Sequence, residues 1–372
     1  MYDQILEDTL YVMLYTLVAG MAMMASFYLL FRRANAIAPD VTPPLRLRRW
    51  TAALFAAITL NHLWYTPMFF LTSNEDIVMN DLVGGLLDSM TVFPLTIIVL
   101  LTMLQDRRRS LWPIAVMFAP LVAGNALCLA TRSYVFLPKL YVYALLMCIG
   151  LIIYMVRATR QYGHWLRDNY ADLEHKEVWQ SFLVLAIMLL VFVVYVLVGE
   201  GPTYQYAMQV IVIVLICYLL WRVETLSDLS SPVSDDLSLS IRSRSASPLG
   251  LSKNMGPLLQ KYCIDTQLYL QHDLTLLQLT QAIGTNRLYL SQYFSNQGTT
   301  YNAYINNLRI NHFISLYQEA VAAHRIFTVQ QLAQESGYRS YSTFSRAFKL
   351  QMGQSVREWM CDSDQNCSNQ QK

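Results

Sequence analysis

Charged residues are scarce in this 372-residue chain: they make up 14% of it, whereas hydrophobic residues make up 55%. A typical soluble domain carries about 25% charged residues, so the composition excludes a chain built only from such domains. The formal net charge is only +2, which by itself indicates no strongly acidic or basic partner. Where the charges lie along the chain is therefore more informative than their sum.

Sequence motifs of enzymes are also missing. The chain has no His-Glu-x-x-His zinc motif, no glycine-rich phosphate-binding loop and no Gly-x-Ser-x-Gly motif around a nucleophilic serine. His164 and His175 flank an acidic loop, but no ATP-binding module follows them, which argues against a histidine kinase. The last long apolar stretch has no lysine that could hold retinal. The sequence therefore predicts no enzyme activity, no cofactor and no metal site.

The six cysteines do not form a recognisable pattern, and no pair of them has zinc-finger spacing. Three lie in long apolar stretches, where thiols pack as small apolar groups, and three lie in the C-terminal third of the chain. We therefore expect no disulfide framework.

Seven long apolar stretches account for the hydrophobic composition. Each is about 20 residues long, which matches the hydrocarbon core of a bilayer. The first is not typical of a cleavable signal peptide, because its leading region is acidic and its apolar part is too long. The stretches are residues 10–31, 50–71, 82–104, 112–131, 134–156, 179–199 and 203–221.

Basic and acidic loops alternate between these stretches, and the alternation predicts an orientation. The first, third and fifth loops are rich in Arg, as in Arg107-Arg108-Arg109, whereas the N-terminal region and the second loop carry Asp and Glu. Basic loops tend to face the cytoplasm, so the N-terminus is predicted outside and the chain after Trp221 inside. This topology describes a multi-pass protein of the cell (inner) membrane, in contact with membrane lipid.

A serine-rich segment follows the last apolar stretch. Residues 223–256 contain many serines and few apolar residues, which predicts a flexible linker. The predicted organisation is therefore a transmembrane region at 1–222, this linker, a soluble domain at 257–361 and a disordered tail at 362–372. The predicted fold class is all-α throughout.

The soluble domain contains one sequence pattern twice. Gly284 and Gly337 lie 53 residues apart, and Phe294 and Phe348 lie 54 residues apart. Such a regular period indicates a duplicated structural unit. Each copy has the order of a helix-turn-helix, with a short supporting helix, a turn at the glycine and a second, reading helix. The predicted helices are 276–283 and 286–296 in the first copy, capped by Thr275, and 329–335 and 340–349 in the second, capped by Thr328.

Apolar spacing predicts which face of each reading helix is buried. Leu290 and Phe294 point to the core in the first copy, as Phe344 and Phe348 do in the second. Apolar residues between Tyr301 and Leu316 predict a long connecting helix. The residues left facing outward are Arg287, Leu288, Ser291 and Gln292 in the first copy, and Tyr341, Ser342, Ser345 and Arg346 in the second.

These residues resemble the AraC-type tandem helix-turn-helix domain. The resemblance runs from Tyr262 to Met360, about a quarter of the chain, and includes Leu290-Ser291-Gln292-Tyr293-Phe294, Ser336-Gly337-Tyr338 and Phe344-Ser345-Arg346-Ala347-Phe348-Lys349. It implies that both reading helices enter successive major-groove segments on one face of double-stranded DNA. Two departures are Thr280, where a small alanine is usual, and Gln354-Ser355, where Thr-Pro is common.

The resemblance also assigns residues to the DNA contact. Base-contacting positions of the family fall on Leu288, Ser291 and Gln292, and on Tyr341, Ser342 and Arg346. Contacts to phosphate outnumber contacts to bases, so Lys261, Arg309, Arg339 and Lys349 are interpreted as phosphate contacts or surface charges. The domain carries a net charge of +3 between Pro257 and Met360. This charge is modest for a lone monomer, and a homodimer is therefore expected.

Polar residues inside the apolar stretches are costly and therefore informative. Asn61, His62, Asp88 and Asn125 are predicted to lie toward the outer half of the membrane. Two interpretations remain open. These residues either line a cleft for a small polar or amphipathic ligand, or bond one another and hold the bundle together.

The combination of a membrane region and a DNA reader leads to two functional hypotheses. The first is a membrane-anchored, one-component transcription regulator that responds to an unknown small-molecule or membrane signal. The alternative is a transporter or lipid-handling membrane protein with a regulatory DNA-binding tail. Transporters usually show discontinuous spans or internal repeats, and the sequence shows neither clearly.

Overall fold

The chain forms two compact units in the computed structural model, which describes residues 2–32, 35–39, 41–132, 135–183, 186, 202–229 and 255–370. The first unit comprises Met1–Tyr162 and Val178–Ser231, and the second comprises Gly163–Glu177 and Pro232–Lys372. Every regular element among the described residues is a helix, as predicted. The division itself differs from the prediction, because the segment Gly163–Glu177 belongs to the second unit.

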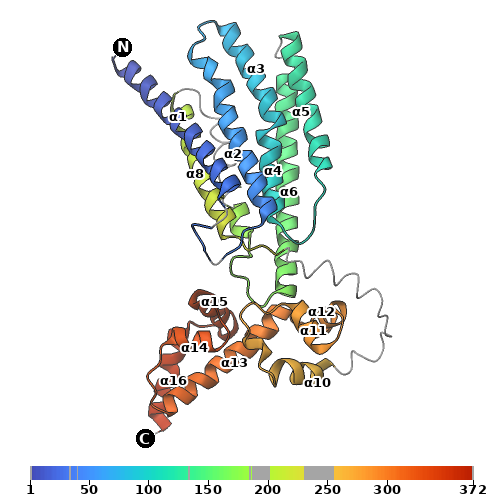
Figure 1. Ribbon diagram of the computed structural model, residues 1–372, viewed down its shortest axis with the longest axis vertical. Helices are drawn as coiled ribbons and strands as arrows, with labels where there is room; N and C mark the ends of the chain where they lie inside the picture. Colours follow the sequence, from blue (N-terminus) through green and yellow to red (C-terminus); the bar gives the residue numbers. More distant parts are fainter. Residues whose placement is uncertain are drawn as a thin grey trace. The chain divides into compact units, whose positions relative to one another are not determined.

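The first unit is a bundle of long helices that run side by side (Figure 1). Helix α1 packs on α2 and α8, α2 also packs on α4, and α3 packs on α5. The helices are α1 (Tyr2–Phe31), α2 (Leu45–Tyr65), α3 (Asn74–Met90), α4 (Val92–Met103), α5 (Trp112–Thr131), α6 (Leu137–Asn169) and α8 (Pro202–Thr225), with a short 3-10 turn at Thr66–Phe69.

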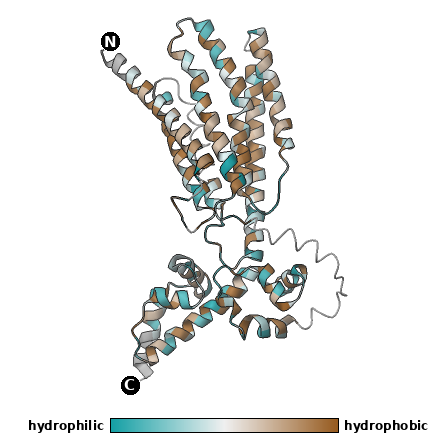
Figure 2. Cartoon of the chain, in the orientation of Figure 1, coloured by the Kyte–Doolittle hydropathy of each residue, from teal (hydrophilic) through white to brown (hydrophobic). Residues whose placement is uncertain are grey.

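Five of the described helical stretches are long and apolar enough to cross a membrane. Figure 2 shows that hydrophobic residues predominate along the helices of this unit, and many large apolar side chains on them are exposed. Helix α2, which covers most of the predicted second span, is not among the five, since it begins with Arg46, Arg48 and Arg49 and ends with polar residues. The predicted sixth span, 179–199, lies largely outside the described residues. A count of seven spans therefore stays a prediction.

The predicted third span is broken. Helix α3 ends at Met90, α4 begins at Val92, and Thr91 between them has φ −124° and ψ −75°, outside the helical region. Pro94 explains the break, because proline has no N–H to donate and its ring crowds the carbonyl four residues before it. The hydroxyl of Thr91 donates to the carbonyl of Leu87 at 2.7 Å and so bonds a carbonyl beside the break.

Residues 223–229, which were predicted to begin the linker, lie in the first unit. Helix α8 continues to Thr225, and Glu224 is fully buried, with its Oε1 3.4 Å from Nε of Arg48 in α2. Beyond the helix, the carbonyl of Ser227 accepts a hydrogen bond from Gln105 at 2.9 Å. A buried carboxylate needs such a charged partner. Because Glu224 and Ser227 both bond to residues of the bundle, residues 223–229 belong to the first unit rather than to a linker. The rest of the serine-rich segment, 230–254, lies outside the described residues.

Helix α6 is also longer than predicted. Its predicted span ended at residue 156, whereas the helix runs without interruption from Leu137 to Asn169. No proline follows Pro138 within it, so nothing in the sequence stops the helix where its apolar part ends. Its residues up to Tyr162 belong to the first unit and its last turns belong to the second.

The second unit contains two small hydrophobic cores that share one long helix, α13 (Tyr301–Ala322). Leu290, Phe294 and Ile305 lie in the first core, and Phe313 and Phe344 lie in the second. The other elements are α10 (Met255–Leu259), turns at Gln260–Ile264 and Leu268–Leu270, α11 (Leu276–Ile283), α12 (Arg287–Asn296), α14 (Val329–Glu335), α15 (Tyr341–Met352) and α16 (Val356–Gln370).

The final helix extends into the segment 362–372, which was predicted to be a disordered tail. Residues 362–370 continue α16, which begins after a cap at Ser355. The Ser355 hydroxyl accepts from the backbone N–H of Glu358 at 3.3 Å, and the Glu358 carboxylate accepts from the Ser355 N–H at 2.7 Å. This reciprocal cap explains how Ser355 starts the helix without the usual Thr-Pro. No glycine or proline follows to end it.

Candidate nucleic-acid interface

Side-chain caps start all four helices of the duplicated unit. Thr275 caps α11 in a reciprocal capping box with Gln278, and Thr328 caps α14. The reading helices are α12 and α15, and they are capped by Asn286 and Ser340. Such caps satisfy backbone N–H groups at a helix start and are each worth about 1 kcal/mol. The predicted supporting helices and reading helices are confirmed to within a few residues.

The turn glycines have the left-handed backbone that the motif requires. Gly284 has φ +76° and Gly337 has φ +89°, where side chains other than glycine are strained. Gly337 also packs closely against the backbone of Leu270, because a Cβ on Gly337 would lie 2.8 Å from the Cα of Leu270. Thr280, the departure in the supporting helix, is buried, and its hydroxyl donates to the carbonyl of Leu277 at 2.7 Å. The substitution therefore leaves no polar group unsatisfied.

The two reading helices present equivalent faces. Leu290 and Phe294 of α12 are buried, as are Phe344 and Phe348 of α15. Gln292 and Arg346 each lie six residues after the capping residue of their helix and are both exposed. The duplication thus places two polar side chains at matching positions on two outward faces.

Most of the predicted DNA contacts are accessible. Leu288 is 68% exposed and Tyr341 is 43% exposed, so both side chains are free to contact a thymine methyl group. Ser291 is half-buried. The exposed polar positions at or beside the reading helices are Arg287, Gln292, Arg339, Ser342, Arg346 and Lys349.

Arg309 does not lie on this surface, and its interpretation as a phosphate contact or surface charge is wrong. It is 1% exposed. Its guanidinium donates to the carbonyl oxygens of Tyr269 at 2.7 Å, Gln271 at 2.7 Å and His272 at 3.2 Å. Burial lowers the pKa of Arg309 below its ordinary value. Arg309 therefore ties the loop before α11 to the connecting helix and is structural.

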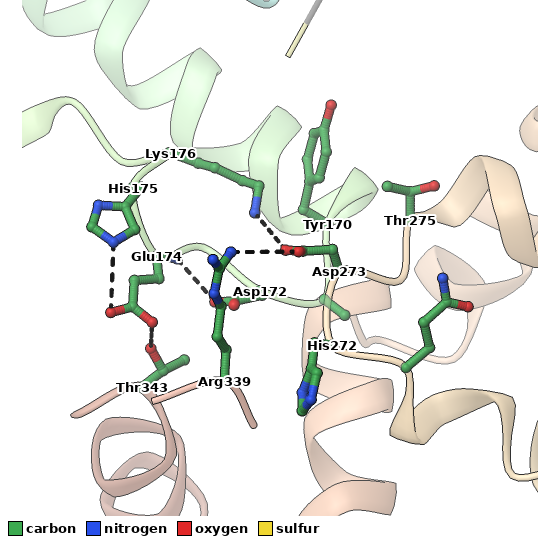
Figure 3. A network of polar contacts seen from close by, with 12 residues as sticks. Tyr170, Asp172, Glu174, His175, Lys176, His272, Asp273, Thr275, Arg339 and Thr343 are labelled. Carbon is green, nitrogen blue, oxygen red and sulfur yellow. Dashed lines mark hydrogen bonds and ion pairs between the residues drawn. The ribbon is translucent and has the colours of Figure 1, made fainter. Parts of the chain in front are cut away.

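The segment Gly163–Glu177, here called the inserted segment, packs into the second unit (Figure 3). Ala171 is buried in the first core, and its N–H donates to the carbonyl of Leu274 at 3.1 Å. Asn302 of α13 donates to the carbonyls of Tyr170 at 3.1 Å and Ala171 at 2.6 Å. These contacts attach the segment to the connecting helix between the two readers.

Charged side chains of the inserted segment meet the domain beside this anchor. Nζ of Lys176 lies 3.4 Å from Oδ1 of Asp273, and Nη1 of Arg339 lies 3.8 Å from Oδ2 of the same carboxylate. Asp172 is buried nearby, and burial raises its pKa, while the N–H of Glu174 and the charge of Lys176 lower it. Arg339, a predicted DNA contact, is thus partly engaged within the protein.

The inserted segment also contacts both reading helices. Oε2 of Glu174 accepts hydrogen bonds from the hydroxyls of Ser340 at 2.6 Å and Thr343 at 2.9 Å, and Oε2 of Glu177 lies 3.0 Å from Nη1 of Arg346. Arg287 of α12 donates to Asn169. The sequence analysis missed these partners. The acidic character of the loop between His164 and His175 was the available signal, but it does not reveal a contact with residues more than 100 positions away.

A second polar cluster lies in the first unit. Asp88 of α3 accepts from Asn61 at 2.8 Å and from the hydroxyl of Tyr65 at 3.1 Å. His62 does not pair with Asp88, and its Nε2 lies 3.1 Å from the amide of Gln209 in α8. The structure thus brings Asn61 and Asp88 together and places His62 beside them on α2, in a separate contact. Tyr15 of α1, which the sequence analysis missed, donates to the His62 carbonyl at 2.6 Å.

Gly84 allows this cluster to form. A Cβ on Gly84 would lie 2.3 Å from the ring of Tyr65, so only glycine lets that ring lie against α3 and reach Asp88. A Cβ on Gly85 would lie 4.0 Å from Oδ1 of Asn125, which places Asn125 against α3 one turn from Asp88. Three of the four predicted membrane residues are therefore near one point of α3, and His62 adjoins it.

Comparisons with known proteins find one family match, and it lies in the second unit. Residues 279–361 match the protein family described as "Helix-turn-helix domain". Two curated relatives, both named TCP pilus virulence regulatory protein and found in two strains of Vibrio cholerae serotype O1, are 33% identical over 78 residues. The match covers 21% of this chain and 26% of each relative, so the chain spans about a quarter of their length. No solved structure matches the chain. The C-terminal region thus contains a helix-turn-helix domain.

Proposed function

We propose that this chain is a membrane-anchored transcription regulator that reads double-stranded promoter DNA with two helix-turn-helix units. The observation that carries the proposal is the pair of equivalent, exposed reading faces on α12 and α15 of one duplicated unit. The family match and the regulatory name of the two relatives favour the same role. The modest charge of the domain favours a homodimer on DNA.

Membrane anchoring is supported by the first unit. Only 6% of the most apolar window of α6 is buried, and large apolar side chains such as Leu146 and Ile153 are exposed on it. Soluble proteins rarely expose an apolar surface of this extent, whereas lipid covers it at no cost. The proposed location is the inner membrane, with the DNA-binding domain in the cytoplasm.

The polar cluster around Asp88 is proposed as the site where a small-molecule or membrane signal acts. The broken helix at Thr91 lies directly after it, and such breaks accompany ligand sites in membrane proteins. The same break is the one observation that favours the alternative, a transporter or lipid-handling protein with a regulatory tail. The exposed DNA readers favour the regulator.

The DNA-reading role predicts distinct effects at the two helices. Selection of duplexes from a random library by the full-length protein should recover a preferred sequence. Arg346→Ala should cost about 1–3 kcal/mol and relax preference at one or two positions, and Gln292→Ala should relax preference in the other half of the site. Lys349→Ala should weaken all sequences alike, because a phosphate contact carries no sequence information. Recovery of no preferred sequence would contradict the proposed function.

Reporter fusions test the topology. Fusions after Asn74 and Glu200 should report an external position, and those after Arg109 and Leu229 a cytoplasmic one, because the basic loops should remain inside. A cytoplasmic signal after Asn74 would refute the proposed orientation.

A further inference from the structure

We propose that the inserted segment is an internal competitor of DNA, whose carboxylates hold the second reading helix where DNA phosphates would bind. DNA binding then requires Glu174 and Glu177 to leave α15. This inference rests on the proposed function, since it names the device that regulates the same DNA-binding surface.

The contacts at α15 have the chemistry of a phosphate site. Ser340 caps α15, and Thr343 and Arg346 follow at intervals of three residues, so the three side chains lie along one side of the first half of the helix. Hydroxyls, an arginine and a helix N-terminus are the groups that proteins use to hold DNA phosphates. In the structure Glu174 accepts from both hydroxyls and Glu177 pairs with the arginine. Two carboxylates thus occupy the donors that a DNA backbone would need.

The inserted segment also engages the first reader. Asn169 accepts a hydrogen bond from Arg287, the first residue of α12, and Asn302 fixes the backbone of the segment to the connecting helix. One continuous segment therefore contacts both reading helices and the helix that sets their spacing. A DNA duplex that enters both helices must meet the same three elements.

Charge complementarity favours the DNA-like role over incidental packing. The inserted segment has four acidic residues and two basic ones, Arg167 and Lys176, whereas the domain from Pro257 to Met360 has a net charge of +3. Its single lysine, Lys176, meets the acidic Asp273. The segment is thus opposite in charge to the domain, and its lysine meets one of the domain's carboxylates.

The contact with α15 is suited to reversal. The side chain of Arg346 remains 69% exposed in its pair with Glu177, and exposed ion pairs are weak. The anchoring contacts at Ala171 are buried by contrast. Glu174 and Glu177 can therefore leave α15 when DNA binds there. The buried contacts at Ala171 keep the two carboxylates close to the helix, at a high local concentration.

Helix α6 gives this device a connection to the bundle. The inserted segment begins within α6, which runs unbroken from Leu137 to Asn169.

The test compares DNA binding by the full-length protein in lipid nanodiscs with that of Glu174→Gln/Glu177→Gln. Glutamine keeps the shape and removes the charge, so the variant should bind the selected duplex about tenfold more tightly, which corresponds to about 1.4 kcal/mol. The matched control, Asp265→Asn/Glu319→Gln, removes two exposed carboxylates elsewhere in the domain and should change affinity much less. Equal affinities of the two variants would overturn the inference.

Hydrogen exchange on the wild-type protein supplies a second readout. The duplex should slow exchange at the start of α15 and speed it at residues 172–177, because the two occupants exclude one another. Protection of both regions in the same complex would overturn the inference and leave the proposed function intact. Failure of the wild type and the Glu174→Gln/Glu177→Gln variant to bind any duplex, while both stay folded, would overturn the proposed function and the inference with it.

Discussion

An Arg309→Met variant should unfold its C-terminal domain at a clearly lower urea concentration than the wild-type chain. Methionine fills a similar volume but donates no hydrogen bond, so the carbonyls of Tyr269, Gln271 and His272 lose their shared donor. Buried groups left without partners cost about 1–3 kcal/mol each, and a loss of about 3–5 kcal/mol is expected. Typical domains are stable by only about 5–15 kcal/mol.

The thiol of Cys263 reports this unfolding. Cys263 is fully buried in the first core, and burial raises its pKa to about 11, so it should react with an alkylating reagent only when the core opens. Alkylation of the Cys263 peptide across a urea series gives the midpoint. Arg357→Met, at an exposed position of α16, is the matched control and should leave the midpoint nearly unchanged. An unchanged midpoint in Arg309→Met as well would show that the three bonds contribute little.

The sequence predicted the helix-turn-helix units well because their signals are local. Capping residues such as Thr275 and Ser340, the turn glycines, and apolar residues four positions apart each act within one turn of helix. These short-range preferences agree with the packing of the two cores, so the predicted supporting helices match α11 and α14. The residues that face outward on the two reading helices followed from the same periodicity.

Arg309 shows where such reasoning fails. An arginine in a helix beside polar neighbours resembles a surface charge, and nothing nearby in the sequence marks it as buried. Its partners lie 37 to 40 residues earlier, in a loop whose carbonyls have no helical partner. Burial of a charged residue depends on the acceptors that tertiary structure brings to it, and these were not visible in the sequence.

The inserted segment could not be predicted for a related reason. Its acidic residues were assigned to a loop of the membrane region, because loops were judged by their neighbours in the chain. Glu174 and Glu177 contact residues 166 to 169 positions away. In the bundle the apolar stretches located most helices. The break at Thr91 depends on a single proline, Pro94, and α6 extends to Asn169 because no proline follows Pro138 to stop it.

An Asp88→Asn variant should keep the bundle folded but fix transcription of the target promoter in one state. Asparagine can reproduce both bonds, since its oxygen can accept from Tyr65 and its amide can donate to a rotated Asn61 side chain. Only the negative charge is lost. If that charge recognises the signal, the variant should reach the membrane at normal levels and no longer change output with external pH, salt or added amphiphiles.

Asp88→Ala and Asp81→Asn separate this role from a purely structural one. Alanine leaves the donors on Asn61 and Tyr65 without their acceptor, so it should destabilise the bundle by about 2–4 kcal/mol, measured as a lower temperature of thermal aggregation. Asp81→Asn makes the same charge change at an exposed position of α3 and should behave as wild type. If Asp88→Asn responds normally while Asp88→Ala is unstable, the cluster serves only to hold the helices together, because in that case its hydrogen bonds matter and its charge does not.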